Sequence, residues 1–134
     1  MEGQTYYERM VTEKRGWYKA VRQVHCPLLS EDIHFTSKGF RHLLYDGLGH
    51  ARSKKERMYR LGLLPLLIPV IKNANEVIEY KSEFSKKLGK KTEIWELGHV
   101  VGKQNTKVTV ILRRIGTGNI HFYSIWKKKD KRRN

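Results

Sequence analysis

The spacing of apolar residues predicts helices in the first half of the chain. The apolar positions of one helix face are Phe40, Leu43 and Leu44. Ser37 is a suitable N-cap before them, and Gly47 is a stop signal after them. The pattern therefore predicts a short helix over residues 38–46 whose other face is polar.

A second helical stretch follows this helix. The residues of Ser53–Glu56 fit a capping box, in which a serine and a glutamate together cap the start of a helix. Pro65 suits the first turn of a further helical segment, whereas Pro69 is expected to kink it. The helical half is expected to end near residues 73–75.

Beyond Glu76 the apolar period falls to two, which is typical of strands. The segments expected as strands are 77–81, 93–97, 107–113 and 120–126. Short turns between consecutive strands imply an antiparallel meander, and helices followed by a meander are an α+β pattern. We therefore expect N-terminal helices packed on a C-terminal four-stranded antiparallel meander sheet. The segments 24–29 and 31–35 also look extended.

The length of 134 residues allows one core but not two. We expect a single domain with its core over residues 24–127 and a basic tail over 128–134. Residues 1–23 fit either a short helix or an extended arm. No apolar run approaches the ~18 residues of a membrane span, and a lone Cys26 allows no intrachain disulfide. A cytoplasmic protein that does not enter the membrane is expected.

The charge of the chain is its strongest functional signal. Twenty-eight Lys and Arg against thirteen Asp and Glu give a net charge of +15. Such a charge repels itself in the folded state, so a polyanionic partner is expected to offset it. Nucleic acid comes first, and an anionic membrane or an acidic protein comes second. Contacts to phosphates would position the nucleic acid without reading its sequence.

The chemistry that the residues allow is narrower. None of the six histidines lies in an H-E-x-x-H motif or a Cys/His cluster, and the acidic residues are scattered. We therefore expect neither a metal nor another cofactor. A phosphate-binding loop and a serine-hydrolase motif are missing too. What remains is chemistry on RNA, whose own 2′-hydroxyl is the nucleophile and which needs only a base, an acid and cations.

Three segments carry a resemblance to a known family: IHFTSKGFRHLL over residues 33–44, LGLLPLLIPVIKNANEVIEY over residues 61–80, and IHFYSIW over residues 120–126. Together they resemble the barnase–EndoU–colicin–RelE (BECR) superfamily, in particular its phage and mobile-element branch. This resemblance implies N-terminal helices on a four-stranded antiparallel sheet and cleavage of RNA without a metal. It also implies that a His or Lys of the early helix and a hydroxyl or basic residue of the last strand carry the site, here His42 and Ser124.

These arguments predict two groups of site residues. The candidate catalytic residues are His42, Arg60, Ser124 and Tyr123, and the candidate RNA-binding residues are Lys38, Arg41, Arg57, His121 and Lys127. His42 should face away from the apolar seam of its helix. Lys38 and Arg41 beside it are expected to lower its pKa by repulsion, whereas Asp46 would raise it. The sequence does not rank these two effects.

Simpler interpretations stay open for most of these residues. His42 fits an ordinary surface histidine, and Arg60 fits an ion pair with Glu56 one helical turn earlier. In a regular last strand, Phe122, Ser124 and Trp126 would share one face, and Ser124 would then be a small core hydroxyl. The expected function is a toxin-like or mobile-element endoribonuclease, with an acidic antitoxin or immunity protein as a candidate partner. The alternatives are a non-catalytic nucleic-acid-binding protein and a protein-interaction module.

Overall fold

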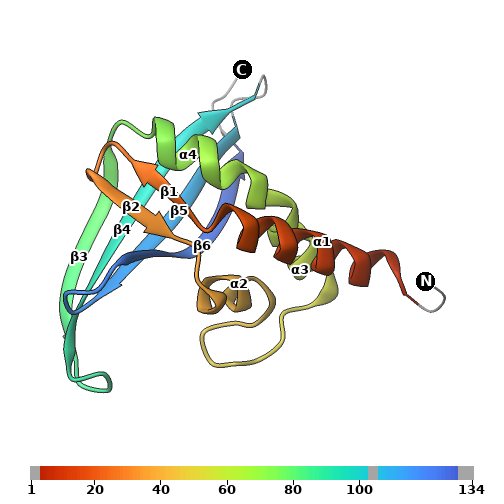
Figure 1. The fold of residues 1–134 in the computed structure, drawn as a ribbon, viewed down its shortest axis with the longest axis horizontal. Helices are drawn as coiled ribbons and strands as arrows, with labels where there is room; N and C mark the ends of the chain where they lie inside the picture. Colours follow the sequence, from red (N-terminus) through yellow and green to blue (C-terminus); the bar gives the residue numbers. More distant parts are fainter. Residues whose placement is uncertain (1–3, 103–105, 130–134) are drawn as a thin grey trace.

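The computed structural model describes residues 4–102 and 106–129, except for the side chains of residues 128 and 129. Its helices are α1 (Tyr6–Val21), α2 (Ser37–Leu44), α3 (Lys54–Leu63), the 3₁₀ turn η1 (Leu64–Leu66) and α4 (Leu67–Asn73). Its strands are β1 (Gln23–Cys26), β2 (Glu31–His34), β3 (Val77–Ser85), β4 (Lys90–Val101), β5 (Thr106–Ile115) and β6 (Ile120–Lys129). The expected α+β class is confirmed (Figure 1).

The sheet has six strands in the order β1-β2-β6-β5-β4-β3, not the four that the sequence predicted. Strands β3 to β6 form the expected antiparallel meander. The extended segments before α2 form a β1–β2 hairpin, and β2 pairs with β6 in parallel through Ile33 with Ile120 and His34 with His121. The prediction of an all-antiparallel sheet was therefore wrong. A parallel pairing between segments almost ninety residues apart leaves no local turn signal to predict it from.

Helix α4 lies across one face of the sheet (Figure 1). Its apolar residues Leu67, Val70 and Ile71 are fully buried. The strands supply the other half of this core, with Leu97, Val108, Val110, Leu112 and Phe122 fully buried. Pro65 stands in the first turn of η1, as the sequence predicted, because a missing amide donor costs nothing there.

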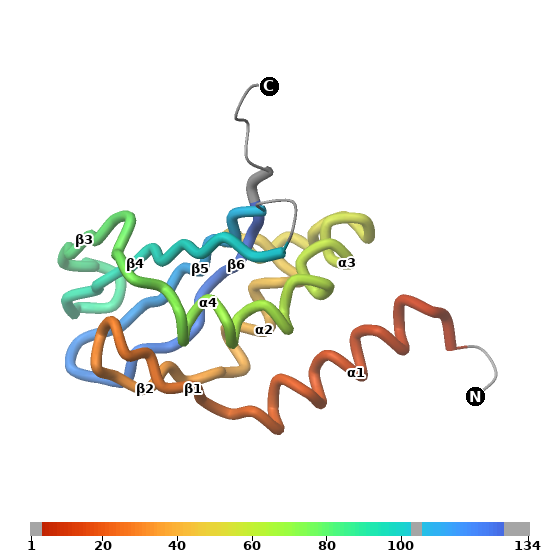
Figure 2. Tube along the Cα trace, turned by 90° about the horizontal axis from the view of Figure 1, so that it is seen from above, coloured from red at the N-terminus to blue at the C-terminus, as the bar shows by residue number. Residues whose placement is uncertain are grey.

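Residues 6–21 form a helix, which settles the choice that the sequence left open for the N-terminal segment. Thr5 and Glu8 form a reciprocal capping box at its start. Near its end, the Tyr18 ring stacks on Phe35 with centroids 5.0 Å apart, and its hydroxyl donates to the Thr36 carbonyl at 2.7 Å. Figure 2 shows that only the C-terminal end of α1 lies close to the sheet, while its first turns extend away from it.

Helix α2 lies against β6 at a very short distance. The helix begins at Ser37 with Thr36 as its N-cap, one residue earlier than expected. A Cβ on Gly39 would come within 2.5 Å of the Phe122 carbonyl oxygen and 2.7 Å of the Tyr18 hydroxyl. Only glycine allows this approach, so Gly39 determines how deeply α2 packs against the last strand.

The ends of the chain add two observations. In the part that the structure describes, no helix is both long and apolar enough to cross a bilayer. The expected basic tail falls on residues 128–134, of which 130–134 lie outside the described residues.

Candidate active site

Strand β6 has an edge that β2 covers only in part, because β2 pairs with residues 120 and 121 alone. Beyond them, helices α2 and α3 pack against the edge. The Tyr59 hydroxyl accepts from the Lys127 amide at 2.9 Å, and Arg60 donates to the Ile125 carbonyl at 3.4 Å. Side chains of the helices thus replace the missing strand, which brings helical residues directly beside β6.

A cleft of about 440 Å³ opens at this edge. It lies between α2 with the loop after it, the β3–β4 turn, and the ends of β5 and β6. Its lining includes His42, Arg113, Tyr123, Lys38 and Arg41. Of the nine candidate site residues from the sequence, four therefore line one cleft, and Arg113 joins them.

His42 is half-buried rather than on an open surface. Its ring contacts the Tyr123 ring at a centroid distance of 4.4 Å. Its Nδ1 is fully enclosed and has no hydrogen-bond partner among the described residues. The other ring nitrogen, Nε2, is not both enclosed and unpaired. The ring thus turns Nδ1 inward, and the residue lines the cleft.

Burial is the main cause that lowers the pKa of His42, followed by the charges of Arg52, Arg113 and Arg60. Asp46 raises this pKa, but with a smaller effect. The structure therefore ranks the opposing effects that the sequence left unranked, and the repelling charges are not those of Lys38 and Arg41. A neutral imidazole near pH 7 is what a general base requires.

A β-bulge in β6 sets the orientation of Tyr123 and Ser124. Ile111 pairs with Ser124 and Leu112 pairs with Phe122, so that Tyr123 has no partner on β5. Phe122 and Ile125 are both fully buried in the core, and the two residues between them leave the core face together. The regular alternation expected for this strand was wrong because the extra residue shifts its period.

Arg113 joins the aromatic and histidine side chains of the cleft. Its guanidinium carbon lies 4.4 Å from the centroid of the Tyr123 ring. Its Nε donates to His121 Nε2 at 3.3 Å, as expected for residues paired across β5 and β6. This bond requires His121 to be neutral at Nε2. Burial, followed by the charge of Arg113, lowers the pKa of His121 to about 4, which keeps it neutral.

Arg60 and Ser124, two of the candidate catalytic residues, are in contact. Arg60 Nη1 donates to Ser124 Oγ at 3.0 Å, and its Nε donates to Glu56 at 2.6 Å. The side chain of Arg60 is only 15% exposed. The ion-pair interpretation of Arg60 is therefore confirmed, and the charge of Arg60 also lowers the pKa of His42.

Five candidate residues are not part of the cleft lining, and two of these, Arg57 and Lys127, also lack a side-chain hydrogen bond to the cleft residues described above. Arg57 donates to the Tyr7 hydroxyl at 2.9 Å and so joins α3 to α1. Lys127 is exposed further along β6, where its backbone is held by Tyr59. Neither position brings a charge next to His42.

The sequence analysis missed Arg52 and Arg113. Arg52 lies in the loop before α3 and donates to the His42 carbonyl at 3.0 Å; a loop residue of this kind carries no periodic signal. Arg113 could have been found from the sequence, because the tight turn at residues 116–119 sets the register of β5 and β6. This register places Arg113 opposite His121.

The described residues bring no three His, Cys, Asp or Glu side chains together as a metal site would require. Comparison of the chain with protein-family models, with curated proteins and with solved structures gives no match. The case for a function therefore depends on the residues of the cleft.

Proposed function

We propose that this protein is a metal-independent endoribonuclease of the BECR type, which acts on RNA in the cytoplasm. The observation that carries the proposal is a half-buried His42 that lines the cleft and whose pKa is lowered by burial and by the charges of Arg52, Arg113 and Arg60. A base beside several fixed cations is the combination that cleavage of RNA by its 2′-hydroxyl requires. The net charge of +15 supports RNA as the polyanion.

The reaction assigns one role to each group. His42 takes the proton of the 2′-hydroxyl as the 2′-oxygen attacks phosphorus, and the bond from phosphorus to the 5′-oxygen breaks. Arg113 balances the charge that develops on the phosphate oxygens, and Arg60 adds a second cation from the α3 side. The Tyr123 hydroxyl, whose ring packs on His42 and under Arg113, donates a proton to the leaving oxygen. The products are a 2′,3′-cyclic phosphate and a 5′-hydroxyl.

Other groups have supporting roles in this proposal. Lys38 and Arg41 on the rim of the cleft hold neighbouring phosphates. Arg52 orients α2 through its bond to the His42 carbonyl. Ser124 positions Arg60. A cell that makes such an enzyme needs protection, and an acidic antitoxin or immunity protein would fit the basic surface.

The test is incubation of the purified protein with a labelled single-stranded RNA in excess EDTA, followed by analysis of the product ends. We expect cleavage that persists in EDTA and leaves cyclic phosphate ends. Loss of cleavage in EDTA with recovery in Mg²⁺ would contradict the mechanism. Tight RNA binding without cleavage would favour the non-catalytic alternative. A His42→Ala protein purified in parallel distinguishes the activity from a contaminating ribonuclease.

A further inference from the structure

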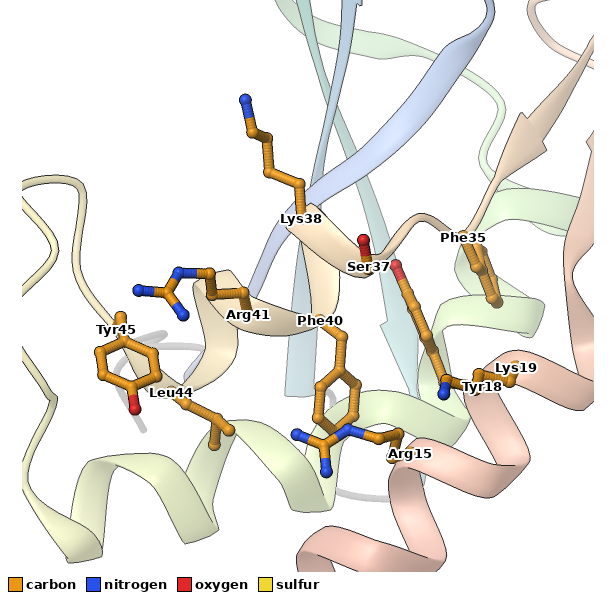
Figure 3. Close-up of a pocket in the computed structure, with 10 residues that line it drawn as sticks. All are labelled: Arg15, Tyr18, Lys19, Phe35, Ser37, Lys38, Phe40, Arg41, Leu44 and Tyr45. Atoms are coloured by element: carbon orange, nitrogen blue, oxygen red, sulfur yellow. The ribbon is translucent and has the colours of Figure 1, made fainter.

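A second hollow lies on the other side of α2 from the cleft. It has a volume of about 620 Å³ and separates the C-terminal half of α1 from α2 (Figure 3). Arg15 reaches into it from α1 over Phe40, and Arg41 and Tyr45 lie at its opposite end, with Leu44 between them. We call this hollow the α1–α2 groove.

The groove is positively charged along its rim. Four cationic side chains line it: Arg15, Lys19, Lys38 and Arg41. None of its described lining residues is acidic. Arg15 and Lys19 are exposed and make no ion pair among the described residues. Their charges are therefore free to bind an anion.

The floor of the groove is apolar and aromatic. Phe40, Leu44 and Phe35 form it together with the Tyr18 ring. The Arg15 guanidinium carbon lies 4.9 Å from the Phe40 centroid, and that of Arg41 lies 4.3 Å from the Tyr45 centroid. The aromatic rings hold both guanidinium groups in place. Flat cations above an apolar floor suit a phosphate with an attached base, which stacks on such planes.

The groove and the cleft are continuous along α2. Lys38, Arg41 and Tyr45 line both of them. A strand of RNA that leaves the cleft past Lys38 and Arg41 therefore reaches the groove without crossing an acidic residue of the described lining, apart from Asp46 in the cleft itself.

We propose that the α1–α2 groove is a subsite for a nucleotide of the same RNA strand that flanks the scissile phosphate. This inference rests on the proposed function and states where the RNA strand lies beyond the cleft. Arg15 and Lys19 hold a phosphate, and the base lies against the apolar floor. The enzyme accordingly acts on single-stranded segments of several nucleotides, because a duplex would not offer an unstacked base.

The experiment compares two substrates, a dinucleotide and an unstructured octanucleotide RNA. The groove variant is Arg15→Gln/Lys19→Gln. Its matched control is Lys72→Gln/Lys81→Gln, which removes the same charge from exposed positions outside both hollows. In the native protein KM should fall as the substrate lengthens. In the groove variant this gain from substrate length should shrink on the order of tenfold at ~0.1 M salt, and the slope of log affinity against log salt should fall by about 0.7 for one lost phosphate contact.

Affinity for a 2′-O-methyl octanucleotide, which has no 2′-hydroxyl to attack, is measured on the same proteins. The groove variant should bind it more weakly than the control variant does. Equal affinity and equal KM for the two variants would overturn the inference, and this is also the result expected if the groove serves an acidic protein. If no RNA is cleaved, the proposed function fails, and the 2′-O-methyl RNA still decides whether the groove binds RNA.

Discussion

The two faces of the sheet at β5 and β6 differ in the side chains that cover them. On one face, Leu112 and Phe122 are fully buried in the apolar core, where Phe122 packs against Tyr18 and Phe35. On the other, Arg113 and Tyr123, one position further along each strand, line an open cleft. Apolar side chains of α1, α2 and α4 cover the first face, whereas on the second face α2 places the polar ring of His42 against Tyr123.

This difference teaches that stability and chemistry occupy alternate positions of the same strands. Strand geometry sends neighbouring side chains to opposite faces, and the bulge at Tyr123 turns Ser124 away from the core face, where it is buried against Arg60. A change on the core face should therefore unfold the protein, and a change on the cleft face should stop cleavage with little cost to the fold. The predictions below test this separation.

The largest effect is expected for His42→Ala. A general base contributes about 10²–10⁴-fold to a rate, so we expect cleavage to fall by that factor. The stability of the protein should change little, because the ring is only half-buried and its Nδ1 makes no hydrogen bond among the described residues. Rates on a labelled RNA and urea unfolding curves measure the two quantities.

The matched control for this change is His25→Ala. His25 lies on the β1–β2 hairpin, is 60% exposed, and pairs with Asp32 away from both hollows. It should keep native activity. Unchanged cleavage by a folded His42→Ala protein would reject His42 as the base. The pH dependence adds a check, since kcat/KM should rise with pH through a pKa below 6.5, the ordinary value, and then level off.

Gly39→Ala should lower both stability and cleavage, unlike a change confined to one face of the sheet. The added Cβ would meet the Phe122 carbonyl and the Tyr18 hydroxyl well inside contact distance, so α2 must move away from β6. Overpacking of this kind costs about 1–3 kcal/mol, and the same movement carries His42 off Tyr123. Stability and cleavage should therefore fall together, as urea unfolding and RNA cleavage would show.

Gly16→Ala serves as the control for this substitution. Gly16 is also helical, but apart from its own helix turn nothing lies within 4 Å of the position of its added Cβ. Alanine should stabilise α1 by roughly 0.5–1 kcal/mol. If Gly39→Ala behaved like Gly16→Ala, the close approach of α2 to β6 would not be what positions the site.

The helices after residue 36 and the meander strands could be predicted from the sequence because their signals are local, whereas α1 was left open. The seam of Phe40, Leu43 and Leu44, the cap at Ser53 and the turn at residues 116–119 each act over a few residues. The β2–β6 pairing could not be predicted, because it joins segments far apart in sequence. The bulge was missed for another reason: one extra residue in a strand leaves the apolar pattern almost unchanged.

The candidate site shows the same limit. His42, Tyr123 and the Arg60–Ser124 pair came from residue type and place in the pattern, and the structure brings them to one edge of β6. The cations that lower the pKa of His42 could not be ranked from sequence neighbours. Lys38 and Arg41 are close along the helix, but Arg52, Arg113 and Arg60 face the ring from a loop, a strand and another helix.

The smallest expected effect is the pH dependence that His121 gives to the stability of the protein. Its folded pKa of about 4 lies below the ordinary value of 6.5, so the unfolded chain binds more protons between these pH values. Stability should therefore fall as the pH drops from 6.5 toward 4, by about 1–2 kcal/mol at pH 5 after allowance for solvent screening. His121→Gln keeps an acceptor for Arg113 but cannot titrate. Urea unfolding of both proteins at pH 7 and pH 5 should show a smaller loss in the variant, and equal losses would mean that Arg113 and burial do not hold His121 neutral.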